Sequence, residues 1–137
     1  MTPQLEEAKR LLRLARRDQE TFDLLLPLAQ ANLAALGFHA QQATEKSLKA
    51  IATLRGIEVR RTHDLVALGQ AILDDGGTLP LPTDDLRRLN PFAVEFRYND
   101  EVMPIITREE LNSLLRTLLD WARLLAAESE TDSEPSR

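Results

Sequence analysis

The feature that most constrains the fold is a helical repeat of apolar residues. Within the first 26 residues, apolar side chains recur at alternating steps of three and four and form one seam, interrupted only by Gln19; its members are Leu5, Ala8, Leu12, Ala15, Phe22 and Leu26. Such steps place the side chains on one face of an α-helix, which is buried against a neighbour. No stretch of useful length alternates apolar and polar residues as a strand does, so the pattern predicts an all-α protein.

A second seam, in a helix expected from about Asn32 to Arg55, is built mostly from small residues. Its members are Leu36, Ala40, Ala43, Ser47, Ala50 and Leu54. Small side chains let a neighbouring helix approach closely, and Gly37 extends the same narrow surface. Gly56 is suited to end this helix because glycine readily adopts the left-handed conformation of a C-cap. The second helix is therefore expected to pack tightly.

Local signals place the ends of the first and third helices. Thr2 followed by Pro3 is typical of an N-cap and a first helical residue, and Pro27 is expected to end or kink the first helix. Thr62 is predicted to cap a third helix, which carries Leu65, Leu68 and Ile72 and stops at Asp74-Asp75-Gly76-Gly77.

Two more helices are predicted in the second half of the chain. Thr83-Asp84-Asp85 is predicted to cap a short helix that Pro91 ends. Thr107 and Glu110 fit a capping box, after which apolar residues continue to Leu125. The sequence thus predicts an up-and-down bundle of four main helices plus a short extra helix over residues 1–127, and a disordered acidic tail over residues 128–137.

Composition bounds the compartment and the chemistry. The 137 residues suit one domain, and the absence of cysteine excludes disulfides and thiolate metal sites. The N-terminus has no apolar signal segment, and no apolar run approaches the ~20 residues that a membrane span needs. We expect a soluble, cytoplasmic protein without a cofactor. With only His39 and His63 and no glycine-rich phosphate loop, no metal site is predicted either.

Charge limits the nucleic-acid interactions that can be expected. The net charge is -5, but the last eleven residues hold four acids against one arginine, which leaves the rest nearly balanced. Broad binding to DNA needs a cationic face and is not expected, whereas a local basic pocket for one phosphate or a short RNA is compatible with this balance.

The densest polar group lies on the second helix. It consists of His39, Gln42, Glu45, Lys46 and Lys49, at spacings that allow its members to meet. Lysine and glutamine side chains could bind a phosphate or a base, with His39 as a proton donor. The alternative is an amide and a carboxylate hydrogen-bonded between helices, with solvated lysines.

Two further polar segments are candidate binding sites. Arg60-Arg61-Thr62-His63-Asp64 precedes the third helix, whose free amide groups favour anions, although capping by Thr62 and Asp64 with solvated arginines explains it equally. Arg97 and Tyr98 could hold a phosphate and stack on a base; the alternative is a packed tyrosine beside an arginine paired to an acid.

Several of these residues, taken in order, resemble the HEPN family of higher eukaryote and prokaryote nucleotide-binding domains. The similarity lies in the run FHAQQATEKSLKA at residues 38–50, in Arg55-Gly56-Ile57, in Thr62-His63-Asp64-Leu65 and in Arg97-Tyr98. This resemblance implies a helical bundle that usually forms a homodimer and is often encoded beside a minimal nucleotidyltransferase as a toxin and antitoxin pair.

Some members of this family cut RNA, and the chain departs from their motif. In them an arginine holds the phosphate and a histidine about four to six residues later moves the proton of the 2′-hydroxyl. Here seven residues separate Arg55 from His63, and no histidine follows Arg97. His63 belongs to the Thr-His-Asp-Leu motif and not to the catalytic arginine–histidine motif.

The resulting prediction is a HEPN domain that binds a nucleotide, RNA or a nucleotidyltransferase partner without the ribonuclease motif. The predicted phosphate- and base-binding residues are Arg61, His63, Arg97, Tyr98, Lys46 and Lys49. Two alternatives stay open: a metal-independent ribonuclease toxin that uses His63 or His39 in a dimer cleft, and a structural dimerisation module.

Overall fold

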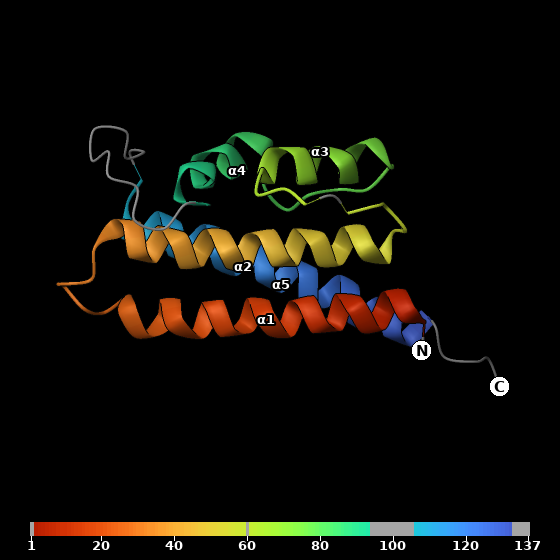
Figure 1. Ribbon diagram of the computed structural model, residues 1–137, viewed down its shortest axis with the longest axis horizontal. Helices are drawn as coiled ribbons and strands as arrows, with labels where there is room; N and C mark the ends of the chain where they lie inside the picture. The colour runs from red at the N-terminus through yellow and green to blue at the C-terminus, as the bar shows by residue number, and fades with distance from the viewer. Residues whose placement is uncertain (1, 60, 94–105, 133–137) are drawn as a thin grey trace.

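The computed structural model describes residues 2–59, 61–93 and 106–132, and within these ranges it contains helices and no strand. The elements are α1 (Pro3–Leu25), α2 (Leu33–Leu54), α3 (Leu65–Asp74), α4 (Thr83–Leu89), a 3₁₀ turn (Asn90–Ala93) and α5 (Arg108–Asp132). The predicted bundle of four main helices and a short extra one is confirmed (Figure 1). In this part of the chain, no helix has the length and apolar character that crossing a membrane requires.

Helix α2 lies at the centre of the bundle. It packs against α1 and α5 on one side and against α3, α4 and the 3₁₀ turn on the other (Figure 1). Its burial therefore extends beyond the predicted small-residue seam to Gln41, Thr44 and Glu45. The close packing that the small residues predicted is present at Gly37, where an added Cβ would lie 2.1 Å from Cδ1 of Phe92.

The predicted ends of α1 and α2 are confirmed. The Thr2 hydroxyl accepts a hydrogen bond from the amide of Leu5 at 3.1 Å, and Pro3 is the first helical residue. Helix α1 ends at Leu25, just before Pro27. Gly56 follows α2 with a φ of 73°, which is the left-handed conformation expected of it.

The segment between α1 and α2 is held by one guanidinium from the start of α5. Arg108 donates hydrogen bonds to the carbonyl oxygens of Ala31 at 2.6 Å, Leu28 at 2.7 Å and Leu26 at 2.8 Å. Carbonyl groups at a helix C-terminus have no partner within the helix, and a cation there also interacts favourably with the helix dipole. Arg108 thus fixes how α1 turns into α2.

The predicted N-cap of α3 is wrong. Asp64, not Thr62, caps this helix, since Oδ1 of Asp64 accepts hydrogen bonds from the amides of Val66 at 3.0 Å and Ala67 at 3.3 Å. Thr62 instead accepts from the amide of Asp64 at 3.0 Å. Asn90 stabilises Asp64 as the N-cap, because the Asn90 side chain donates to Oδ1 of Asp64 at 3.0 Å and accepts from the amide of Leu65.

The cap predicted for α4 is also wrong by one residue. The N-cap is Pro82, which makes no side-chain capping bond, and Thr83 is already helical. Asp84 and Asp85 lie in the first turn, where their charges oppose the positive end of the helix dipole.

Helix α5 begins as predicted and ends later than predicted. Thr107 and Glu110 form a reciprocal capping box, with the two bonds at 3.0 and 3.1 Å. The expected disorder from residue 128 is wrong for residues 128–132, because the helix continues to Asp132. Lys9 on α1 stabilises this last turn through a 2.7 Å ion pair with Glu130. Residues 133–137 lie outside the described ranges.

Candidate functional site

A buried carboxylate, that of Glu45, joins α2 to the segment preceding α3. Its side chain is 6% exposed, and Oε1 lies 2.7 Å from Nδ1 of His63 and accepts a hydrogen bond from Gln41 at 3.2 Å. Oε2 accepts from Nζ of Lys49 at 3.0 Å. We call Gln41, Glu45, Lys49 and His63 the Glu45 cluster.

The helical repeat of α2 brings the first three members together. Gln41, Glu45 and Lys49 are spaced four residues apart, so they follow one another along one face of the helix. Gln41 also donates to the backbone carbonyl of His63 at 3.2 Å. Both the ring and the main chain of His63 are therefore held, which fixes the segment before α3 against α2.

The charge of Glu45 is stabilised by its neighbours. Burial by itself would raise the pKa of this carboxyl, but hydrogen bonds from His63, Lys49 and Gln41 together outweigh burial and hold the pKa of Glu45 below its usual range. An ionised carboxylate can only accept hydrogen bonds, so Nδ1 of His63 carries the proton that lies between them. This assigns the tautomer of the imidazole.

The imidazole of His63 is consequently oriented with one nitrogen inward and the other available to solvent. The side chain of His63 is 69% exposed although its partner carboxylate is buried. With Nδ1 committed to Glu45, Nε2 is the atom that can accept a proton or, when protonated, donate to an anion. Arg61, two residues earlier, is exposed and has no hydrogen bond or ion pair to any described residue.

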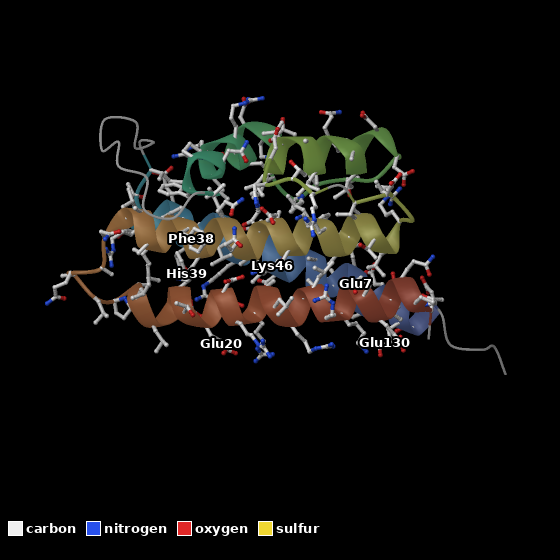
Figure 2. All side chains as sticks on the ribbon, viewed as in Figure 1. Glu7, Glu20, Phe38, His39, Lys46 and Glu130 are labelled. Carbon is white, nitrogen blue, oxygen red and sulfur yellow. The ribbon has the colours of Figure 1, made fainter. Side chains whose placement is uncertain are left out.

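The predicted polar band on α2 is divided between two places. His39 and Lys46 lie on the side of α2 that faces α1 (Figure 2), where Lys46 pairs with Asp18 and Nδ1 of His39 lies 3.8 Å from the same carboxylate. Lys49, in contrast, belongs to the Glu45 cluster. The two predicted lysines therefore do not flank one common site, because Lys46 pairs with a carboxylate of α1 whereas Lys49 pairs with Glu45 on α2 itself.

Other predicted residues cannot be placed in either group. Arg97 and Tyr98, together with Arg60, lie outside the described residues. Among the residues that the structure does describe, no three side chains of the metal-binding types come together as a metal site.

Sequence reasoning missed two contributors to these clusters. Gln41 was not singled out, although its place four residues before Glu45 is a signal for a contact on one helix face. Asp18 was missed because its pairing with Lys46 joins two different helices, and no local spacing in the sequence indicates such a contact.

The fold and this site define a class of protein: a helical bundle in which a buried carboxylate on the central helix orients a surface histidine. The chain belongs to the HEPN family, since the family model of the HEPN domain matches residues 8–121. The chain is also similar to the crystal structure of an archaeal HEPN homologue, with a TM-score of 0.57 and 18% identity over 88% of this chain and 98% of the other. At this identity the likeness concerns the fold alone. A comparison with curated proteins found no match.

Proposed function

We propose that this HEPN domain binds a phosphate group of a nucleotide or of RNA at the exposed side of His63, and that it does not cleave RNA. The observation that supports binding is the fixed imidazole: Glu45 holds Nδ1 from the buried side while most of the ring faces solvent. A ring held this way needs no reorganisation to present Nε2 to a ligand, which lowers the entropic cost of binding.

The charges around His63 suit an anion. Lys49 already compensates the charge of Glu45 within the cluster. The guanidinium of Arg61 makes no hydrogen bond or ion pair with any described residue, and arginine binds phosphate oxygens through two parallel hydrogen bonds.

The surroundings of Arg55 support the absence of cleavage. Arg55 is the arginine that precedes His63 at the distance nearest to the family's catalytic spacing. Its Nε donates to Oδ2 of Asp75 at 2.9 Å, and one terminal nitrogen donates to the Asp75 carbonyl oxygen at the same distance. A guanidinium engaged with the end of α3 is not available to hold the phosphate of an RNA substrate.

A metal-independent ribonuclease is the second candidate. The pair of Glu45 and His63 that supports phosphate binding is also an arrangement used in general acid–base catalysis, where a carboxylate orients the imidazole. Such an enzyme would need its phosphate-holding arginine from another part of the assembly.

One experiment separates the two candidates. The purified full-length protein is titrated with a fluorescein-labelled RNA oligonucleotide and with ATP, and is separately incubated with labelled total RNA in EDTA. We expect His63→Ala and Arg61→Ala to weaken binding by about tenfold each, as loss of a charged hydrogen bond does. The matched control is His39→Ala, which lies in the other cluster and should bind as the wild type does.

Each result decides the proposal. Unchanged affinity in His63→Ala, in a variant shown by circular dichroism to be folded at the assay temperature, would refute the binding site. RNA cleavage by the wild type that disappears in His63→Ala would replace the proposal with the ribonuclease. Intact RNA together with weakened binding in the variant would support it.

A homodimer and a nucleotidyltransferase partner stay predictions that come from the family. Co-expression with the neighbouring reading frame, followed by size-exclusion chromatography with light scattering, tests both. A complex of defined stoichiometry would support partnership, and a monomer at all concentrations would contradict the homodimer.

A further inference from the structure

A groove with an apolar floor and cationic rims runs between α1 and α5. We call it the α1–α5 groove, and it has a volume of about 360 Å³. Its floor is Leu12, Ala126 and Ala127, and its rims carry Lys9, Arg13, Arg16, Arg123 and Glu130. No residue of the Glu45 cluster lines it, and none of the predicted binding residues that the structure describes does.

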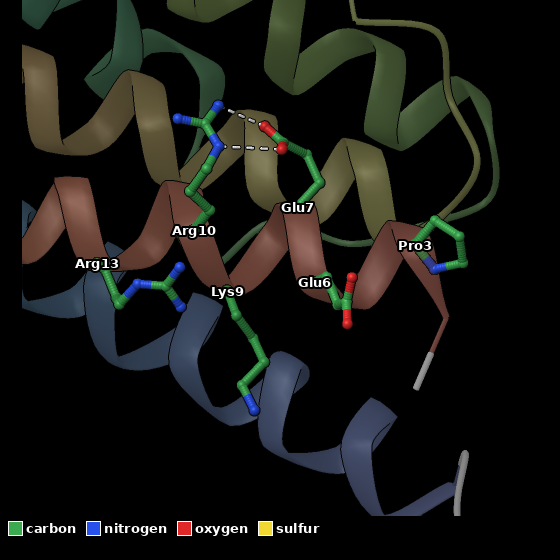
Figure 3. A pocket seen from close by; sticks show the side chains of 6 residues that line it. All are labelled: Pro3, Glu6, Glu7, Lys9, Arg10 and Arg13. Atoms are coloured by element: carbon green, nitrogen blue, oxygen red, sulfur yellow. Dashed lines mark hydrogen bonds and ion pairs between the residues drawn. The ribbon is translucent and has the colours of Figure 1, made fainter.

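The two helices contribute to the groove with the same spacing. Residues 9, 12, 13 and 16 of α1 face residues 123, 126, 127 and 130 of α5, which in each case are positions n, n+3, n+4 and n+7. The helices are antiparallel, as Lys9 at the start of α1 pairs with Glu130 at the end of α5. Figure 3 shows Lys9 and Arg13 directed toward α5, whereas Arg10 points away and pairs with Glu7.

The rim has more positive charge than its own neighbours neutralise. Among the described residues, Arg123 donates a hydrogen bond only to the neutral amide of Gln19, at 2.5 Å. Arg13 has no hydrogen bond or ion pair to any described residue, and Arg16 lies 3.5 Å from Glu20 in a pair that is largely solvent-exposed. A chain whose net charge is -5 thus keeps three guanidinium groups together above one apolar strip.

We propose that the α1–α5 groove docks an acidic amphipathic helix of a partner protein. Apolar residues on one face of that helix would cover Leu12, Ala126 and Ala127, and carboxylates on both flanks would pair with Arg13, Arg16 and Arg123. The small alanines permit close approach of a third backbone, and the step of seven residues from Lys9 to Arg16 spans ~10 Å, about two turns of a docked helix.

The lining favours a peptide helix over nucleic acid. Single-stranded RNA is held in grooves by phosphate contacts combined with aromatic side chains on which bases stack. The described residues that line the groove include no aromatic side chain, and the floor is aliphatic. Glu130 already occupies the Lys9 end of the groove, so one carboxylate–cation contact of the proposed kind exists within the protein itself.

The proposal is tested on the full-length protein with a defined probe. The probe is a fluorescein-labelled synthetic peptide of about four helical turns, with leucines at n, n+3, n+4 and n+7 and glutamates on both flanks. The control peptide has lysine in place of each glutamate. We expect saturable binding of the acidic peptide only, and a loss of about tenfold or more in the double variant Arg13→Glu, Arg16→Glu.

Two matched variants identify the site. Arg17→Glu reverses one charge on an exposed residue of α1 outside the groove, is compared with the single variant Arg13→Glu, and should bind the peptide as the wild type does. Ala127→Trp fills the exposed floor without changing charge and should abolish binding. Equal losses in Arg13→Glu and in Arg17→Glu, or full binding by Ala127→Trp, would show mere charge attraction and overturn the proposal.

Two further results bear on the occupant. Displacement of the peptide by a uridine oligonucleotide would show that the groove takes RNA and would refute the protein partner. The absence of saturable binding of the acidic peptide would also refute it. His63→Ala should leave peptide binding unchanged, so failure of the groove and failure of the phosphate site are distinguishable.

Discussion

Nδ1 of His63 lies 2.7 Å from Oε1 of Glu45, which is 18 positions earlier in the chain. The carboxylate is buried and the imidazole is mostly exposed. This contact fixes the segment before α3 to the central helix and at the same time orients a surface ring. It therefore contributes both to stability and to the proposed phosphate site, and the two contributions can be measured separately.

The carboxyl of Glu45 should make the stability depend on acid pH. Because the folded-state pKa of Glu45 lies below its unfolded value, its contribution is present above about pH 4.5 and is lost as the pH falls through the folded pKa. Urea unfolding of the wild type should therefore show a falling free energy of unfolding below pH 4.5, and Glu45→Gln should show a smaller fall. Glu109→Gln, at an exposed position, is the control and should follow the wild type. Parallel curves for Glu45→Gln and the wild type would contradict this assignment.

The cap of α3 should be sensitive to Asp64 and nearly insensitive to Thr62. Asp64→Ala removes the acceptor of two helix amides and of Asn90, and should lower the free energy of unfolding by about 1–2 kcal/mol. Thr62→Ala removes one exposed hydrogen bond to the Asp64 amide and should cost about 0.5 kcal/mol or less. Chemical denaturation of the two variants side by side measures the difference, and a larger loss for Thr62→Ala would argue for the cap first expected from the sequence.

The helix caps show which N-termini can be predicted from the sequence and which cannot. The starts of α1 and α5 were predictable because each depends on residues within one turn, Thr2 with Pro3 and Thr107 with Glu110. At α3 two capping residues compete, and the choice is made by Asn90, which is 26 residues from Asp64. No local pattern contains that information.

Gly37 should resist replacement by alanine. Alanine favours helix by ~1 kcal/mol over glycine, but its Cβ would overlap the Phe92 ring, and overpacking costs about 1–3 kcal/mol. We expect Gly37→Ala to have a lower free energy of unfolding than the wild type, as measured by urea unfolding. In the double variant with Phe92→Leu, the smaller side chain makes room, so the loss should be less than the sum of the two single losses. Additive losses would mean that the two positions do not compete for space.

Removing the guanidinium of Arg108 should loosen the turn from α1 to α2. Arg108→Ala leaves the carbonyl oxygens of Leu26, Leu28 and Ala31 without their charged donor and should cost about 2–3 kcal/mol. Amide hydrogen exchange should accelerate in residues 26–32 more than in the centre of α2. Arg116→Ala is the control, because its ion pair with Asp23 is exposed and should contribute about 0–1 kcal/mol. Equal losses in both variants would contradict the special role of Arg108.

The candidate site was predictable only in part. His63, Glu45 and Lys49 were all singled out from the sequence, and the four-residue spacing of Glu45 and Lys49 on α2 explains their contact. The contact of His63 with Glu45 depends on how the segment before α3 crosses α2. Lys46 carries the same charge as Lys49 and lies only three residues earlier, yet it faces Asp18 on α1. Residue type and helical spacing identify candidates, whereas the neighbours of α2 determine which of them share a site.

The pairing of Lys9 with Glu130 has a consequence for the connectivity of the bundle. The start of α1 and the end of α5 lie side by side, so the first and last helical turns of the described chain are close in space. A linker joining these two points, with the chain opened instead at the turn of Gly76 between α3 and α4, would keep every interhelical contact described above. We therefore expect such a circular permutant to form the same bundle, because the contacts between neighbouring helices do not depend on the order of the helices along the chain.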